Sequence, residues 1–301
     1  MYWQTTRFQI DLSAPKVMGI VNVTPDSFSD GGHHDNTSAA LRHGELLLRD
    51  GADILDIGGE STRPGAAPVG LAEELARVVP VVKEAVKLGV PVSVDTYKPQ
   101  VMQAVLDLGA DIINDVWALR WRDVQGLADA TRVVAAHPSC GVCLMHMHLE
   151  PQTMQVQPMQ GDVLPQVLSF LKQSALTLCG LGVEKARILL DPGIGFGKTV
   201  AQNFALLARQ SELLVAGYPL LAGWSRKSSL AGMTVRADLG EKLVPHERLA
   251  PSLAAALCAV QQGASVVRVH DVKETVQVLK VLEAIRSTQH TPMDSQGHTA
   301  S

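Results

Sequence analysis

The sequence predicts an α/β fold, a (β/α)₈ barrel of the TIM type, formed by a single domain over residues 1–286. Three observations predict it. The chain has 301 residues, enough for a barrel of about 250 residues. Short apolar runs recur along it, separated by stretches with helical periodicity. These runs are continuous rather than alternating, as expected for parallel strands that are buried on both faces.

The predicted strands follow one another at regular intervals. They span Val17–Val23, Ile54–Gly58, Val92–Asp95, Ile112–Val116, Cys143–Met147, Ile188–Asp191, Leu220–Ser225 and Val266–His270. A doubly wound open sheet is the alternative that this pattern leaves. Residues 1–13 precede the first strand and are expected to cap the bottom of the barrel. The polar stretch 287–301 is expected to be a disordered tail.

Amphipathic stretches lie between the strands. In Leu71–Leu88, apolar residues recur at i, i+3, i+4 and i+7, which is the spacing of one helix face. The other predicted helices are Ser38–Asp50, Pro99–Leu108, Val124–Ala135, Val163–Leu181, Asn203–Leu214, His246–Gln262 and a last helix that includes Val278–Ile285.

Composition narrows the class of protein. Apolar residues make up 46% of the chain and charged residues 19%, which excludes a disordered chain. The net charge of −4 disfavours nucleic acid and anionic membranes as partners. Four cysteines do not make a disulfide scaffold. The sequence has no apolar leader and no run of about 18 apolar residues, so we expect a cytoplasmic protein without membrane partners.

Polar residues stand where the predicted strands end. One such residue is commonly a turn or helix-cap residue, but a convergent set predicts a pocket at the C-terminal face of the barrel. The set contains Asn22, Asp95, Asn114, Asp115, His146, Asp191, Ser225–Ser228 and Arg268–Asp271. Acceptors on Asp95, Asn114 and Asp191 suit a ring edge rich in N–H groups. Donors on Lys227, Arg268 and His270 suit an anion, so the residue types favour a flat heterocycle that carries phosphate.

Two polar loops, 24–36 and 58–66, follow the first two strands. Long loops inside a compact domain are often lids or binding loops, and plain surface connection is the alternative. Phe28 and Arg63, which stand among small residues, favour contact with a ligand.

Other motifs carry less weight. The segment Gly193–Thr199 resembles a phosphate-binding P-loop, but only three residues separate Gly193 from Gly197 where four are needed. We expect its glycines to let backbone approach a ligand. Cys140, Cys143, His146 and His148 resemble a metal cluster, yet strand alternation puts Cys143 and His146 on opposite faces. The motifs of serine hydrolases and zincins do not occur.

Several motifs together resemble the dihydropteroate synthase family. Met18–Gly32 is similar to its first signature and Asp56–Gly65 to its second. Further matches are Ser93–Thr96, Ile113–Asp115, Cys143–Met147, Leu190–Gly193, Ser225–Ser228 and Arg268–Asp271. They run in order over nearly the whole chain. The family is a (β/α)₈ barrel, in agreement with the strand pattern.

The resemblance implies an activity and a site. The family joins 7,8-dihydropterin-6-ylmethyl diphosphate to 4-aminobenzoate in folate biosynthesis, and it is the target of sulfonamides. Carried over, the pterin ligands are Asp95, Asn114, Asp191 and Lys227. The diphosphate ligands are Asn22, Arg268 and His270, with Asn22 touching Mg²⁺. Thr62 and Arg63 would close over the substrate, and Asp30 would organise the reacting centre. Phe28, Pro64 and Ser228 would frame the aminobenzoate.

The family also implies a homodimer.

Two other functions stay open at this point. One is a methyltransferase of the same barrel group that moves methyl from methyltetrahydrofolate to a corrinoid, which would have no use for the diphosphate residues. The other is a non-catalytic pterin-binding paralogue, which should have lost loop or anion-binding residues.

Overall fold

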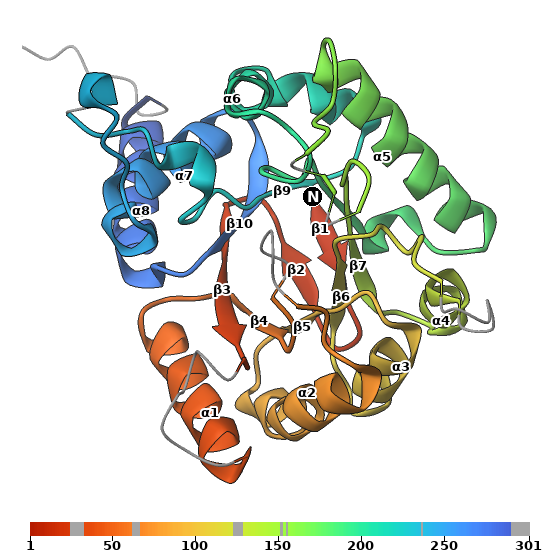
Figure 1. Cartoon of the computed structure of the whole chain (residues 1–301). Helices are drawn as coiled ribbons and strands as arrows, with labels where there is room; N and C mark the ends of the chain where they lie inside the picture. Colours follow the sequence, from red (N-terminus) through yellow and green to blue (C-terminus); the bar gives the residue numbers. More distant parts are fainter. Residues whose placement is uncertain are drawn as a thin grey trace, which may run out of the picture.

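Eight parallel strands close into a barrel that is surrounded by helices (Figure 1). The computed structural model describes residues 1–24, 33–61, 67–122, 129–150, 153–154, 156–235 and 237–289. The strand order is β10-β3-β4-β5-β6-β7-β8-β9, so the last strand pairs with the first barrel strand and closes the ring. The predicted (β/α)₈ barrel is confirmed.

The barrel strands lie close to their predicted positions. They are β3 (Lys16–Asn22), β4 (Ile54–Gly58), β5 (Val92–Asp95), β6 (Ile112–Asp115), β7 (Gly141–Met145), β8 (Ile188–Asp191), β9 (Leu220–Ala222) and β10 (Ala264–Val269). β7 begins two residues earlier than predicted because Gly141 pairs with Ile112 of β6. β9 ends before Ser225 because the backbone turns there, and Arg226 has a left-handed φ of 58°.

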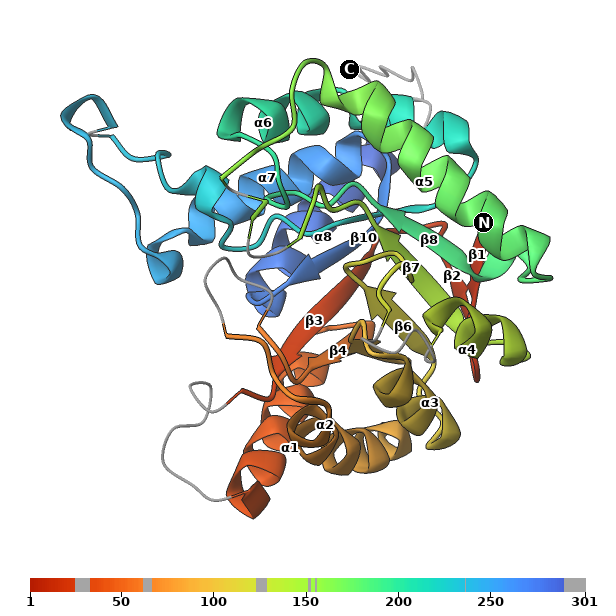
Figure 2. The same ribbon diagram turned by 45° about the vertical axis from the view of Figure 1, so that its right-hand side comes forward.

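The helices follow the strands in alternation. They are α1 (His33–Arg49), α2 (Leu71–Ala85), α3 (Pro99–Asp107), α4 (Ala130–Ala136), α5 (Val163–Gly180), α6 (Val200–Ala208), α7 (Leu249–Gln261) and α8 (Val272–Gln289). The predicted helix Asn203–Leu214 is divided into α6 and a 3₁₀ segment, Gln210–Ala216. Figure 2 shows the chain between β9 and α7, which contains the short 3₁₀ helices Ala237–Leu239 and Pro245–Glu247, reaching out from the barrel.

Side chains alternate between the barrel interior and the helix layer, as strand geometry requires. One inward layer is apolar and contains Met18, Ile54, Ile112, Cys143, Leu189, Leu221 and Val266. Two residues further along several strands, the next inward position is polar: Asp56 after Ile54, Asn114 after Ile112, Asp191 after Leu189 and Arg268 after Val266. Outward residues such as Val17, Leu55 and Val267 pack under the helices. The pattern puts a polar site directly on an apolar floor.

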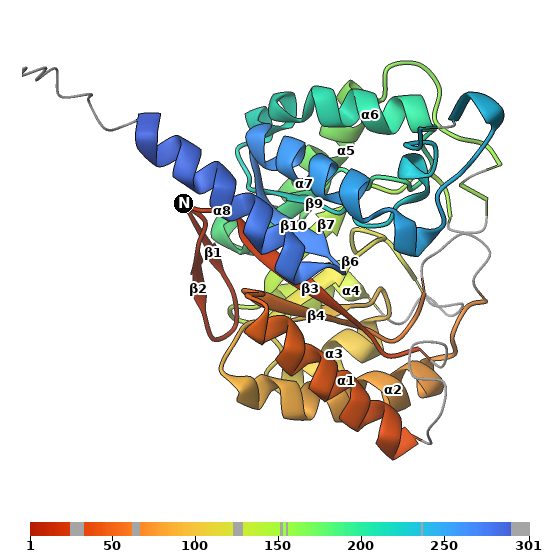
Figure 3. The same ribbon diagram turned by 90° about the vertical axis from the view of Figure 1, so that its left-hand side faces the viewer.

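An antiparallel hairpin, β1 (Tyr2–Gln4) and β2 (Gln9–Asp11), packs against the apolar layer from the other side. Trp3 is fully buried there, and its Nε1 donates a hydrogen bond to the carbonyl oxygen of Arg187 at 2.9 Å. Figure 3 shows the hairpin at the end of the barrel where the strands begin. The opposite end is therefore left for a site.

The last helix reaches further than the sequence predicts. α8 continues to Gln289, and residues 290–301 of the expected tail lie outside the described residues. Among the helices of the described segments, none has the length and apolar character that crossing a membrane requires.

Candidate active site

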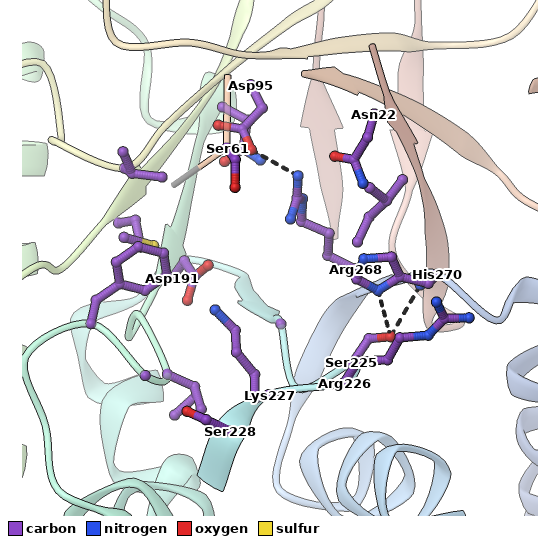
Figure 4. A pocket seen from close by; sticks show the side chains of 18 of the residues that line it. Asn22, Ser61, Asp95, Asp191, Ser225, Arg226, Lys227, Ser228, Arg268 and His270 are labelled. Atoms are coloured by element: carbon purple, nitrogen blue, oxygen red, sulfur yellow. Dashed lines mark hydrogen bonds and ion pairs between the residues drawn. The ribbon is translucent and has the colours of Figure 1, made fainter. Parts of the chain in front are cut away.

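One cavity at the carboxyl ends of the barrel strands brings the predicted residues together. Its volume is about 260 Å³, near the lower end of the range for small-molecule pockets. The eight described residues to which the family resemblance gives a role all line it: Asn22, Asp95, Asn114, Asp191, Lys227, Ser228, Arg268 and His270. Of the wider set of strand-end residues, Asp115, His146 and Asp271 do not line it. The eight come from six strands or from the turns that follow them, so closure of the barrel is what assembles the pocket (Figure 4).

An arginine in the cavity wall pairs with two carboxylates: Asp95, which also lines the cavity, and Asp56, which lies behind it. Arg268 Nε donates to Asp56 Oδ2 at 2.6 Å, and its Nη2 donates to Asp95 Oδ2 at 2.8 Å. Asp56 is fully buried and also accepts from Ser93 Oγ at 2.6 Å and from Asn114 Nδ2 at 3.2 Å. Burial raises the pKa of Asp95 to about 7, against the opposing effect of the Arg268 charge. Asp95 can therefore gain or lose a proton near neutral pH.

A lysine faces a carboxylate on a neighbouring wall. Figure 4 shows the Lys227 side chain directed toward Asp191. Asp191 Oδ1 accepts a hydrogen bond from Gly193 N at 2.7 Å. Burial raises the pKa of Asp191, while this backbone hydrogen bond and the Lys227 charge lower it. The Lys227 ammonium lies 4.3 Å from the centre of the Phe196 ring, a cation–π contact. This wall offers an acceptor, a cation and an aromatic face.

A histidine and a serine form the side next to β10. Ser225 Oγ lies 2.9 Å from His270 Nδ1 and accepts from His270 N at 3.1 Å. The serine hydroxyl can donate to Nδ1, and in that tautomer Nε2 carries the N–H of the ring and can donate to an anion.

Comparison with known proteins decides the family. The family model for pterin binding enzymes matches residues 18–270. The dihydropteroate synthase of Neisseria meningitidis serogroup B is 49% identical over 94% of this chain and 97% of its own length. The chain belongs to the dihydropteroate synthase family.

Solved structures of the dihydropteroate synthase family agree. The Burkholderia cenocepacia synthase, in complex with 7,8-dihydropteroate, matches with a TM-score of 0.83 and 47% identity, covering 96% of this chain and 97% of that one. The Xanthomonas albilineans synthase with 4-aminobenzoic acid matches with a TM-score of 0.84 and 45% identity, covering 97% of this chain and 100% of that one. The resemblance found in the sequence is confirmed, and with it a transferase function.

Sequence reasoning missed several residues of this family member's site. Asp56 received no role of its own, although a carboxylate in the middle of a buried apolar run was the signal for it. Ser225 and Arg226 belonged to the predicted strand-end set but had no role of their own; both line the cavity, and Ser225 contacts His270. Arg248 also lines the cavity, and its Nη1 donates to the Arg226 carbonyl oxygen at 2.9 Å. Arg248 lies just before α7, and nothing in the local sequence pointed to it.

The middle of the second family motif, at Glu60, is held by an ion-pair network. Lys98 Nζ pairs with Glu60, and with Glu74 Oε2 at 2.5 Å. Tyr97 OH donates to Glu60 Oε1 at 3.0 Å. Glu60 and its neighbour Ser61 line the cavity, so the network places the chain at the edge of the pocket.

Five predicted residues lie outside the described residues: Phe28, Asp30, Thr62, Arg63 and Pro64.

The cysteines and histidine near β7 have separate surroundings. Cys143 is buried in the barrel interior, and Cys140 accepts a hydrogen bond from Arg187 Nη2 at 3.2 Å. His146 packs edge-on against Phe170 at 5.0 Å. No group of three or more His, Cys, Asp or Glu within the described ranges could hold a metal ion.

Proposed function

We propose that this chain condenses 7,8-dihydropterin-6-ylmethyl diphosphate with 4-aminobenzoate, giving 7,8-dihydropteroate and pyrophosphate in folate biosynthesis. The observation that carries the proposal is the convergence of eight predicted residues, of both charge signs, on one cavity. Relatives that bind 7,8-dihydropteroate and 4-aminobenzoic acid support the choice of substrates.

The pterin would be held by Asp95, Asn114, Asp191 and Lys227. The Asp95 and Asp191 carboxylates suit the N–H groups along a pterin edge, and the Lys227 ammonium suits its carbonyl oxygen. Arg268 supports this set because it fixes the Asp95 carboxylate at 2.8 Å. A pterin ring that displaces water from the cavity would lower the local dielectric, and this would strengthen each of these contacts.

The diphosphate would lie against Asn22, Arg268 and His270. Arg268 Nη1 takes part in neither carboxylate pair, so it is the guanidinium nitrogen that remains for a phosphate oxygen. In the tautomer in which Ser225 donates to Nδ1, the His270 ring offers its Nε2 N–H to a phosphate oxygen. These groups would share the charge that develops as pyrophosphate leaves.

The described residues fit Mg²⁺ that arrives with the substrate. Mg²⁺ prefers oxygen ligands and commonly takes one or two from the protein, with the rest from phosphates and water. Asn22, at the end of β3 and on the cavity wall, offers an amide oxygen of this kind. When bound, the ion would neutralise part of the diphosphate charge.

In the reaction, the C–O bond to the diphosphate would break with its electron pair on the leaving group. The amine nitrogen of 4-aminobenzoate would form the new C–N bond and then lose a proton. This nitrogen is neutral near pH 7, so the residues need to position it rather than activate it. We assign that task to Ser228, Phe28 and Pro64. Thr62 and Arg63 would exclude water, and Asp30 would organise the reacting centre.

Three further statements rest on the family resemblance. We propose that the chain forms a homodimer, works in the cytoplasm and is inhibited by sulfonamides, which are arylamines like 4-aminobenzoate. Sedimentation of the purified chain tests the first, and competition against 4-aminobenzoate tests the last.

A product assay tests the reaction. The purified protein is incubated with the dihydropterin diphosphate, 4-aminobenzoate and Mg²⁺, and dihydropteroate is detected by mass. We expect product that disappears when Mg²⁺ is chelated and returns when it is added back. Bound pterin without product would overturn the proposal in favour of the corrinoid methyltransferase or the non-catalytic paralogue.

A further inference from the structure

The glycine-rich segment after β8 contains a buried lysine that is absent from the cavity wall. Lys198 is 2% exposed and is not among the residues that line the cavity. Its Nζ donates to three main-chain carbonyl oxygens: Gly193 at 2.8 Å, Phe196 at 3.1 Å and His146 at 3.3 Å. Burial of an ammonium is costly, and here burial lowers the pKa of Lys198 to about 7. Three converging carbonyl dipoles offset part of that cost.

Glycine conformations bring these carbonyls to one point. Gly193, Gly195 and Gly197 have φ values of 68°, 84° and 72°, in the left-handed region that other residues rarely adopt. A Cβ on Gly193 would lie 1.9 Å from His146 O, and one on Gly197 would lie 2.6 Å from His148 Cβ. The segment therefore packs directly on the backbone that follows β7, and the Lys198 ammonium joins the two.

The same segment supports Lys227 of the active site. The Phe196 ring lies against the Lys227 ammonium, and the Cβ position of Gly195 is 3.4 Å from Lys227 Cδ. Asn203 adds a second connection, because its Oδ1 accepts from Gly195 N at 3.0 Å and its Nδ2 donates to Ser229 Oγ at 2.9 Å. Lys227 is thus flanked by the same segment to whose carbonyl oxygens Lys198 donates.

We propose that Lys198 is a positioning residue for pterin binding: its buried ammonium fixes residues 193–197 against the end of β7, and these residues hold Lys227 opposite Asp191. The inference rests on the proposed function only in naming the pterin as ligand. In this motif, which resembles a P-loop, the lysine binds backbone carbonyl oxygens and not a phosphate.

The test is a double-mutant cycle on pterin affinity. The probe is 6-hydroxymethyl-7,8-dihydropterin, which lacks the diphosphate, and its dissociation constant is measured by calorimetry for the wild type, Lys198→Met, Lys227→Ala and the double variant. Methionine has nearly the length of lysine but donates no hydrogen bonds. We expect Lys198→Met to weaken binding about tenfold in the wild type and less than about twofold when Lys227 is already alanine, because coupled residues are not additive.

Equal weakening in both backgrounds would overturn the proposal, since a general structural defect does not depend on Lys227. Lys185→Met is the control. Lys185 lies over the Tyr218 ring, 4.9 Å from its centre and away from the cavity lining, and we expect no change in pterin affinity.

If Lys198→Met does not fold, Lys198→Ala with added n-propylammonium replaces it. Binding restored by n-propylammonium but not by tetramethylammonium, which has no N–H, supports the role; no restoration opposes it. A wild type that binds the probe but makes no dihydropteroate refutes the synthase proposal and leaves this one standing.

Discussion

The Arg268 side chain compensates two carboxylates at the bottom of the active site, so its removal should destabilise the protein in a pH-dependent way. We predict that Arg268→Met lowers the melting temperature strongly at pH 8.5 and much less at pH 5.5. Asp56 is fully buried and the Asp95 side chain is 12% exposed, so water can replace little of what the guanidinium supplies. Methionine keeps the bulk of the side chain but leaves both carboxylates without their cation.

The magnitude follows from the contacts. Breaking a buried ion pair from one side costs about 3–5 kcal/mol, and we take about 3 kcal/mol because the Arg268 side chain is itself 23% exposed. For a domain of this size, about 2–4 °C per kcal/mol converts this to a fall in melting temperature of about 6–12 °C.

The pKa of Asp95 is already raised to about 7, and loss of Arg268 raises it further. A folded-state pKa above the unfolded value favours the folded protein at low pH, so the variant loses stability as pH rises. About 2 kcal/mol of its defect should therefore be absent at pH 5.5, where Asp95 is protonated.

Scanning calorimetry at the two pH values measures the effect. Arg209→Met serves as control, because Arg209 pairs with Asp162 and Glu212 on the exposed surface and its loss should show no pH-dependent defect. The reasoning would be refuted by an Arg268→Met defect of equal size at pH 5.5 and pH 8.5.

Four further predictions concern the site and its surroundings. Lys227→Ala should sharply weaken pterin binding and turnover, and near-normal kinetics would refute its role. Arg63→Ala should reduce kcat more than pterin affinity, whereas equal losses in both would mark a simple binding contact. Ser225→Ala removes the hydroxyl at 2.9 Å from His270, so KM for the diphosphate substrate should rise about three- to tenfold while affinity for a dihydropterin without diphosphate stays unchanged. Burial raises the pKa of Asp115 to about 7, so this group alone should contribute at most about 4 kcal/mol to a fall in wild-type stability as pH rises from about 4 to 7, beside the contribution of Asp95. Asp115→Asn should reduce this slope in urea unfolding, and an unchanged slope would contradict the assignment.

Much of the fold was predictable because its signals are local. Continuous apolar runs located the first residue of all eight strands to within two residues, and the largest difference is at β7 and β10, which each begin two residues earlier than predicted. Helix interruption was not predictable in the same way. Apolar spacing continues from α6 into the 3₁₀ segment, while the backbone changes at Arg209, whose side chain binds Asp162 and Glu212.

The site was predictable to the extent that it repeats strand alternation. Asp95, Asn114 and Asp191 stand at inward positions near strand ends, and each was found on the cavity wall. Partnerships between those residues were not predictable. Arg268 reaches Asp56 and Asp95, which precede it by 212 and 173 residues, and no spacing in the chain indicates such a pair.

The sequence by itself determined the barrel, the family and the polar residues at the ends of its strands. Only the tertiary structure decided how these residues act on one another: which acid Arg268 compensates, which side of His270 faces Ser225, and that Lys198 binds backbone carbonyls in the interior. The physical reason is range. Side-chain alternation is a property of neighbouring residues, whereas burial, ion pairing and pKa are set when barrel closure brings β10 against β3 and encloses charges that are far apart in the chain.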